Sequence, residues 1–202
     1  MSLDQAGLAQ DLPRDVSDAR ATSWFGTLLA AGCQAVLLVS VIIAYVYLGS
    51  GSEPWPPVGI GPPDVLVAGI GTVLLLASAV PMAWASAGIR QGDQRRLKLG
   101  LALSFVLGAG FLGIAGYEYV RQEFEIETNA YASSFLVLLA FHALQVAIGL
   151  VMSGLVQLWA WLGYYDARRH LAVQNTALNW YYVVASWLVV FAVLYLSPHV
   201  MD

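Results

Sequence analysis

The polar residues with the clearest chemical capability lie inside long apolar stretches of this sequence. His142 and Gln145 occur in the segment from Tyr131 to Leu155, YASSFLVLLAFHALQVAIGLVMSGL. An imidazole and an amide each require a hydrogen-bond partner when they are surrounded by hydrocarbon. We therefore expect the segment to direct these side chains toward other protein groups.

One narrow face of this segment, read as a helix at about 100° per residue, collects its polar and small residues. These residues are Tyr131, Ser134, Leu138, His142, Gln145, Gly149 and Ser153. Gly149 and Ser153 form a small-xxx-small pair, which lets a neighbouring helix approach closely. The segment thus predicts a transmembrane helix whose polar face packs inside a bundle.

His142 is the only histidine in any apolar span, and it has two interpretations. The favoured one is a structural histidine that is hydrogen-bonded between helices; the alternative is a proton relay or a metal ligand. Metal ligation is disfavoured because one histidine cannot build a metal site alone, and no Cys, Asp or Glu shares its face. We accordingly assign no catalytic, cofactor-binding or metal-binding residue to this chain.

Glu118 is the only acidic residue within an apolar span, and it stands near the external end of its helix. It is expected at a depth close to Tyr131 and Ser134, whereas His142 lies about 16 Å from Tyr131 along the next helix. We therefore predict that Glu118 bonds a hydroxyl, a loop amide or water, and does not contact His142. A carboxylate that reaches headgroup water is the alternative.

Two further sets of polar residues suit contacts between helices. Gln34 is the one strongly polar residue inside the first span, while Asn179, Tyr182 and Ser186 share a face of the last span. Gln34 and His142 both fall near mid-membrane, and each can donate and accept a hydrogen bond. We hypothesise that these two form a neutral pair, directly or through one water; separate partners for each are the alternative.

The composition places all these residues in an integral membrane protein. Hydrophobic residues make up 59% of the chain and charged residues 11%, against about 25% charged in soluble domains. The mean hydropathy is +0.69. Three histidines and one cysteine, Cys33, are too few for a disulfide framework, a haem–copper centre or a binuclear copper centre within this chain.

Five apolar segments predict an all-α membrane protein, a bundle of five transmembrane helices. The predicted spans are residues 24–48, 65–89, 97–119, 131–161 and 177–196. Residues 1–22 carry four Asp and two Arg without an apolar core, so we interpret them as a flexible cytoplasmic tail and not as a signal peptide. Residues 23–202 then form the transmembrane domain.

Local signals refine these boundaries. Asp64 is a candidate N-cap for the second span, and Pro81 should kink that span. Gly92 and Asp93 predict a turn before the third span. Residues 164–176, YYDARRHLAVQNT, are read as a basic loop before the last span.

The distribution of basic residues predicts the orientation. Eight of the nine Lys and Arg residues lie in the N-terminal tail, the loop between spans two and three, and the loop between spans four and five. They are Arg14, Arg20, Arg90, Arg95, Arg96, Lys98, Arg168 and Arg169. Only Arg121 lies on the other side, so the positive-inside rule places the N-terminus in the cytoplasm and the C-terminus outside.

Several short motifs follow one another in a specific order between residues 22 and 198. They are WPPVGI at 55–60, Gly92-Asp93, YEY at 117–119, YASSF at 131–135, FHALQV at 141–146 and the tryptophans Trp180 and Trp187. In this order they resemble subunit III of haem–copper oxidases, in the five-helix form that lacks the two N-terminal helices of longer members. Each motif alone is weak, and the resemblance rests on their joint order.

The resemblance has departures that concern proton-handling residues. The family commonly carries a glutamate where Gln34 stands, and a second histidine where Gln145 stands. Its final-helix pattern, Trp-His-Phe-x-Asp-x-x-Trp, reads here WYYVVASW from Trp180 to Trp187. The intramembrane carboxylates are thereby reduced to Glu118, which puts a direct proton-handling role in doubt.

The resemblance implies a non-redox subunit III of an aerobic respiratory terminal oxidase of the cytochrome c oxidase type. Such a chain packs beside subunit I, together with subunit II, and supports oxygen reduction and proton translocation. Haem and copper are expected in the partner subunits, and phospholipid can be bound by this one. The implied location is the bacterial inner membrane, multi-pass, with membrane lipids as partners and no nucleic acid.

Two other functions remain open at this stage. One is the subunit III-like partner of a nitric oxide reductase, because the ligands that would discriminate the two complexes lie in other chains. The other is a freestanding small transporter, which is less favoured because the spans show no inverted repeat and one membrane carboxylate at a helix end.

Overall fold

The computed structural model describes residues 16–51, 54–58, 60, 63–122 and 124–200, so residues 1–15 of the predicted tail lie outside the described residues. All regular secondary structure in the described chain is helical. Five of its helices are long and apolar enough to cross a membrane. The all-α, five-helix membrane fold is therefore confirmed.

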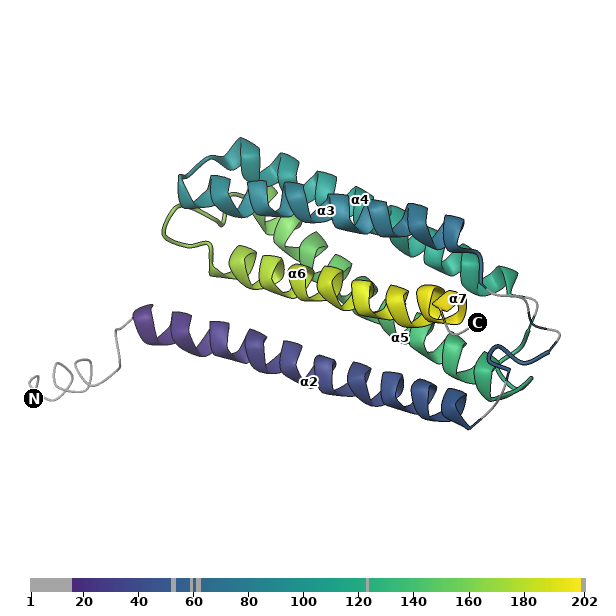
Figure 1. Ribbon diagram of the computed structural model, residues 1–202. Coiled ribbons are helices and arrows are strands. Elements are labelled where there is room, and N and C mark those ends of the chain that lie inside the picture. The colour runs from purple at the N-terminus through teal and green to yellow at the C-terminus, as the bar shows by residue number, and fades with distance from the viewer. Residues whose placement is uncertain (1–15, 52–53, 59, 61–62, 123, 201–202) are drawn as a thin grey trace, which may run out of the picture.

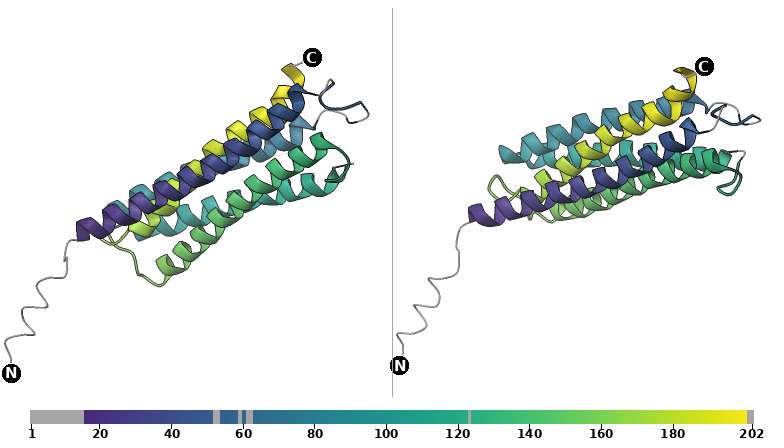
Figure 2. Two further views of the ribbon diagram at one scale, coloured as in Figure 1. Left: turned by 90° about the horizontal axis from the view of Figure 1, so that it is seen from below. Right: turned by 60° about the horizontal axis from the view of Figure 1, so that its bottom comes forward.

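The helices run up and down through the bundle (Figure 1). They are α2 (Val16–Ser50), α3 (Val65–Arg90), α4 (Gln94–Arg121), α5 (Ala130–Trp161), α6 (Leu171–Phe191), the π-helix η1 (Ala192–Leu196) and α7 (Ser197–Val200). Helices α3, α4, α5 and α6 pack as a four-helix core, whereas α2 contacts α5 and α6. Both views of Figure 2 show α2 lying along this pair at the side of the bundle.

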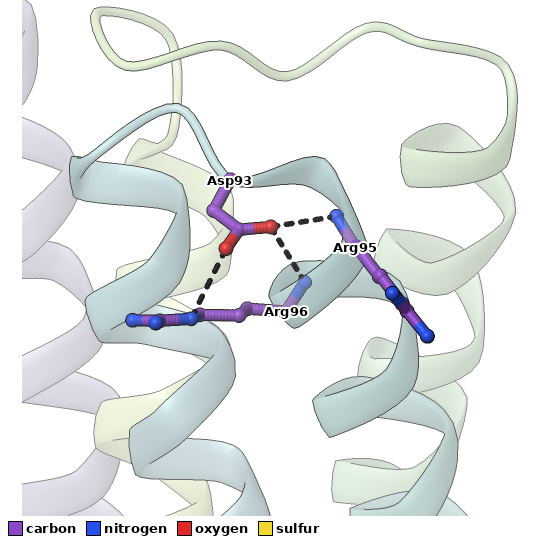
Figure 3. A network of polar contacts seen from close by, with 3 residues as sticks. All are labelled: Asp93, Arg95 and Arg96. Carbon is purple, nitrogen blue, oxygen red and sulfur yellow. Dashed lines mark hydrogen bonds and ion pairs between the residues drawn. The ribbon is translucent and has the colours of Figure 1, made fainter.

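Capping residues determine where three of these helices begin. The Asp64 carboxylate accepts a hydrogen bond from the Leu66 N–H at 2.9 Å, which confirms the predicted N-cap of α3. Asp93 caps α4 through the N–H groups of Arg95 and Arg96 (Figure 3). Asn129 caps α5 through the N–H of Ala132.

Two helices end in the same glycine motif. After α3, Gly92 has a φ of 78° and its N–H donates to Ile89, while the Asp93 N–H donates to Gly88. After α5, Gly163 has a φ of 80° and its neighbour Tyr164 donates back into the last turn of the helix. Both are Schellman motifs, in which the residue after the helix adopts a left-handed backbone conformation. Glycine adopts this conformation without the steric cost that a Cβ would bring. The predicted Gly92–Asp93 turn is confirmed.

The predicted boundaries differ from the structure mainly at α2 and α6. Helix α2 starts at Val16, before the predicted Trp24. Helix α6 starts at Leu171, so residues 171–176 are not part of a loop as predicted. The reason is tertiary, because Val173, Asn175 and Thr176 are buried against the bundle. Helix α3 continues as α-helix through Pro81.

Close packing of α3 on α4 depends on glycines. A Cβ on Gly100 would lie 2.6 Å from the Pro81 carbonyl oxygen, and a Cβ on Gly88 would lie 2.5 Å from the Cβ of Arg96. Neither helix could approach so closely with a larger residue at these positions. Since lipid tails are as apolar as the helix surfaces, such close approach is what drives association in a membrane.

The centre of the core is Trp180, which α6 inserts between α4 and α5. Its side chain is fully buried, and its indole ring lies against Gly108 of α4 and Gly149 of α5. The indole Nε1–H donates to the Ser78 hydroxyl of α3 at 2.9 Å. Two turns further along α6, the Trp187 Nε1–H donates to the Thr72 hydroxyl of α3 at 2.8 Å. These two tryptophans therefore connect all four core helices.

Gly108→Ala is expected to destabilise the bundle, because the added Cβ would lie 2.5 Å from the Trp180 ring. Overpacking of this kind costs about 1–3 kcal/mol. The matched control is Gly113→Ala in the same helix, where nothing lies within 4 Å of the new Cβ. Thermal unfolding of the purified chain in mild detergent should show a lower midpoint for Gly108→Ala only; equal midpoints for both variants would contradict this packing.

Candidate functional site

The polar interior of the bundle begins at His142, in the middle of α5. Its side chain is fully buried, and its Nε2 lies 3.1 Å from the backbone carbonyl oxygen of Val183 in α6. A carbonyl oxygen can only accept, so Nε2 carries a proton in this orientation, and in a neutral imidazole Nδ1 is then the unprotonated nitrogen. The interhelical hydrogen bond expected of a structural histidine is present, while the structural role itself stays a prediction.

Aromatic rings enclose the rest of the His142 imidazole. Phe111 of α4 lies edge-on at a centroid distance of 5.7 Å, and Trp187 of α6 lies at 4.8 Å. The Nδ1 atom has no hydrogen-bond partner among the described residues. The imidazole is thus held in one orientation by a single hydrogen bond and two rings.

The Val183 carbonyl also accepts from the Ser186 hydroxyl at 2.9 Å. One backbone oxygen on α6 therefore serves both Ser186 and His142. The Val183 carbonyl provides the hydrogen-bond acceptor that the imidazole needs when it is surrounded by hydrocarbon. No other ionisable group is required for this arrangement.

Gln145 lies one turn further along the same face of α5. Its side chain is buried, and Nε2 donates to the Tyr182 hydroxyl of α6 at 3.3 Å. At this pair the polar face of the last span forms a bond between helices, as expected. Asn179 is also buried, with its Nδ2 3.5 Å from the position a Gly149 Cβ would take. The described residues give Gln145 Oε1 no partner.

Gln34 does not reach this cluster. It is half-buried on α2, whereas His142 faces Phe111, Val183 and Trp187 inside the core. With Nε2 bonded to Val183 and Nδ1 unpartnered in the described chain, a direct hydrogen bond between Gln34 and His142 is excluded. The direct form of that hypothesis is therefore wrong, because α2 packs on the outside of α5 and α6 and does not enter the four-helix core. The form bridged by one water stays a prediction.

A second polar cluster lies toward the opposite end, around Glu118 of α4. Glu118 is 7% exposed, and its carboxyl lies near the side chain of Tyr195, which belongs to the π-helix η1. His142 bonds Val183 and not Glu118, and the predicted bond of Glu118 to a hydroxyl, a loop amide or water stays a prediction. Arg96 with Asp93 is the one ion pair found in the described chain, so the structure gives Glu118 no cation.

Aromatic contacts join this cluster to α2 and its following loop. Tyr131, fully buried at the start of α5, lies 5.1 Å from the Trp55 ring and 6.2 Å from the Tyr45 ring between centroids. Phe135 continues the contact to Tyr195 at 5.9 Å. Tyr131 therefore belongs to a structural aromatic cluster. Ser134 bonds the carbonyls of Ala130 and Tyr131 on its own helix, and so does not link helices.

An aromatic layer separates the two polar clusters. Phe111 and Trp187 meet edge-on at a centroid distance of 4.8 Å beside His142, and Trp187 continues to Tyr195 at 6.3 Å. Trp187 therefore contacts both His142 and Tyr195 and lies between the two clusters. No chain of hydrogen bonds connects the clusters in the described residues, and no group of three or more His, Cys, Asp or Glu gathers there to hold a metal.

Sequence reasoning missed the tryptophan–hydroxyl bonds of Trp180 with Ser78 and Trp187 with Thr72. It also missed Asn175, whose Nδ2 donates to the Ser23 hydroxyl of α2 at 2.8 Å. One signal was present: two tryptophans seven residues apart in α6 mark one helical face. Their partners were hidden, because Ser and Thr in a membrane helix usually bond their own backbone.

The chain resembles known proteins over most of its length. Residues 26–198 match the family model of Cytochrome c oxidase subunit III. Cytochrome c oxidase subunit 3 of Synechocystis is 32% identical over 174 residues, which cover 85% of this chain and 74% of the relative. The protein of the same name from Thermostichus vulcanus is 29% identical over 172 residues, 85% of each chain. A vertebrate relative, from Scyliorhinus canicula, is 32% identical over 142 residues, 54% of its length.

The tautomer of His142 can be measured directly. Nitrogen-15 magnetic resonance of histidine-labelled protein should show Nε2 protonated and Nδ1 unprotonated, because Nε2 faces a carbonyl oxygen. His142→Gln identifies the signal by removing it, and His170, outside the spans, serves as the reference. A spectrum with Nδ1 protonated and Nε2 unprotonated would contradict this orientation of the ring.

Proposed function

The chain belongs to the cytochrome c oxidase subunit III family, and from this premise we propose that it supports the catalytic subunit of a haem–copper terminal oxidase without carrying a redox centre. It is a multi-pass membrane protein and a subunit of an oxidase complex. The observation that carries the proposal is the match over residues 26–198 together with five spans in the described chain.

The proposed redox centres, haem and copper, belong to partner subunits I and II. The ligand supply supports this division, since the whole sequence has three histidines and one cysteine. His142 is engaged by Val183 and enclosed by Phe111 and Trp187, so its orientation suits packing and does not suit a metal. Cys33 lies exposed on the outer surface of α2.

The role proposed for the polar interior is static. Neutral amides stand at Gln34 and Gln145, and the aromatic layer of Phe111 and Trp187 interrupts the polar groups between His142 and Glu118. A proton relay needs continuous hydrogen-bonded groups or water. The contribution to proton translocation is therefore that of a rigid neighbour that holds subunit I and its membrane lipids in place.

The proposed location is the bacterial inner membrane, with the N-terminus in the cytoplasm and the C-terminus outside. Two cyanobacterial relatives support the bacterial context. The positive-inside rule supports the orientation, because eight of nine Lys and Arg residues fall in the segments assigned to the cytoplasm.

The assignment is tested by purification in mild detergent through an affinity tag on this chain. We expect it to co-purify with a histidine-rich, many-span subunit and to show the haem absorption of that complex. The same chain expressed without its partners should be colourless. Stoichiometric haem or copper in the isolated chain would overturn the non-redox assignment, and purification from its native membrane without any haem protein would overturn the assignment to an oxidase complex.

His142→Gln separates a packing role from a proton relay. An amide can still donate to the Val183 carbonyl but cannot transfer a proton as an imidazole does. We expect oxygen reduction by the assembled complex to stay near the parent rate, with unchanged haem content as the control for assembly. Loss of a true relay would instead reduce the rate by about 100-fold or more, and that result would restore the relay interpretation.

A further inference from the structure

Two buried hydrogen-bond acceptors of α5 have no donor among the residues that the structure describes. They are the Nδ1 atom of His142 and the Oε1 atom of Gln145. The His142 side chain is completely buried, and Gln145 is 2% exposed. Native proteins nearly always provide a partner for a buried polar atom, because an acceptor that has lost its water without gaining a donor is costly. These two atoms therefore indicate a binding site inside the bundle.

The two side chains are neighbours at the interface of α5 with α6. They are three residues apart on one face of α5, a spacing that places their Cβ atoms about 5–6 Å from each other. The His142 imidazole bonds the Val183 carbonyl at 3.1 Å, and the Gln145 amide bonds the Tyr182 hydroxyl at 3.3 Å. Because Tyr182 and Val183 are consecutive residues of α6, these bonds hold the imidazole and the amide at one level of the bundle.

Both atoms accept hydrogen bonds, so they cannot satisfy each other. The Nδ1 atom of a neutral His142 accepts, because the imidazole proton is on Nε2, which faces the Val183 carbonyl. The Gln145 Oε1 atom accepts, because the amide nitrogen is the group that donates to Tyr182. A ligand that serves both atoms must therefore offer two donors at once.

The protein donors beside His142 are already engaged. Trp187, whose ring centroid lies 4.8 Å from that of the imidazole, donates its Nε1–H to the Thr72 hydroxyl. Ser186 donates its hydroxyl proton to the Val183 carbonyl. Each of these side chains has a single proton to donate, so neither has one left for Nδ1. A bound molecule is therefore needed to supply the donor.

We propose that one water molecule is bound between α5 and α6 and donates its two protons to hydrogen bonds with His142 Nδ1 and Gln145 Oε1. With hydrogen bonds of about 2.8 Å, a water joins acceptors up to about 5.5 Å apart, which matches the spacing of side chains three residues apart on a helix. The Tyr182 hydroxyl keeps its own proton when it accepts from Gln145, and it can donate that proton to the oxygen of the water. Three hydrogen bonds are typical of a buried water.

The water site gives His142 one defined tautomer without a charged partner. A water held by Gln145 presents an O–H group to Nδ1, and an acceptor at Nδ1 keeps the imidazole proton on Nε2. Gln145 is therefore a positioning residue for His142, in addition to its bond with Tyr182. The site needs only α5 and α6, so it stands independently of the oxidase assignment.

The test uses solid-state magnetic resonance of the full-length chain, labelled with nitrogen-15 at histidine and reconstituted in phosphatidylcholine bilayers. Magnetisation should pass from water protons to the Nδ1 signal of His142, and that signal should have the position of an unprotonated nitrogen that accepts a hydrogen bond. A signal at the position of an unbonded nitrogen, or a protonated Nδ1, would overturn the proposal. A bonded position without transfer from water would overturn it too, by showing a direct bond from an inverted Gln145 amide.

Gln145→Met and Gln157→Met form a matched pair, because each replaces a glutamine of α5 by an unbranched side chain of similar length that is only a weak acceptor. Loss of one hydrogen bond, about 1 kcal/mol, corresponds to about fivefold weaker retention of the water. The transfer from water to Nδ1 should therefore fall by about fivefold in Gln145→Met. It should stay unchanged in Gln157→Met, because Gln157 bonds the Lys98 carbonyl at the far end of the helix.

Gln34→Met distinguishes this water from one that His142 shares with α2. Gln34 is half-buried on α2 and is not part of the proposed site, so its replacement should leave the transfer to Nδ1 unchanged. Transfer that is lost in Gln34→Met, or unchanged in Gln145→Met, would overturn the proposal. Circular dichroism checks that the three variants are folded, and for a variant that is not, the transfer measured in the parent chain remains the deciding observation.

Discussion

The insertion of Trp180 between two glycines is the packing constraint on which the rest of the bundle depends. The indole ring fills the space that Gly108 and Gly149 leave, and its N–H reaches the Ser78 hydroxyl on the far side. Hydrogen bonds between membrane helices are worth about 0.6 kcal/mol on average. Most of the stabilisation must therefore come from the ring contacts, while the bond fixes how α6 is rotated. That rotation directs Trp187 toward Thr72 and presents the Val183 carbonyl to His142.

The contacts of the polar groups in the interior follow from this rotation. His142 receives its one acceptor from the backbone of α6, and Gln145 receives the hydroxyl of Tyr182 one turn away. Tyr195, the side chain near Glu118, lies in η1, which follows α6. A π-helix turns through fewer degrees per residue than an α-helix, so it shifts which side chains face inward. Leu194 and Tyr195 are accordingly both fully buried in that short segment.

The sequence was informative wherever the physical cause was local. The spans, the Asp64 cap and the Gly92 turn depend on hydropathy, a short side chain and a left-handed backbone, each readable from a few residues. The start of α6 and the partners of Trp180 depend instead on groups more than 100 residues away, such as Ser78 and Ser23. The direct Gln34–His142 bond is absent for the same reason: equal depth in the membrane does not say which helices are neighbours. Depth did suffice to separate Glu118 from His142, because both stand on consecutive helices.

Helix α2 lacks the inserted tryptophan and the close glycine contacts that join the four core helices. Only 6% of the most apolar 18-residue stretch of α2 is buried. Helix α2 contacts α5 and α6 far more than it contacts α3 and α4. Near its start, Ser23 of α2 accepts a hydrogen bond from Asn175 of α6, and at the other end Tyr45 packs on Trp55 and Tyr131. Between these two anchors its exposed valines and leucines face outward over the length of the membrane. Because α2 is anchored near its two ends, its middle presents an exposed apolar surface to lipid or to a partner subunit. In the four-helix core, by contrast, the contacts of Trp180 and Trp187 with the other three helices fix the arrangement from within the chain.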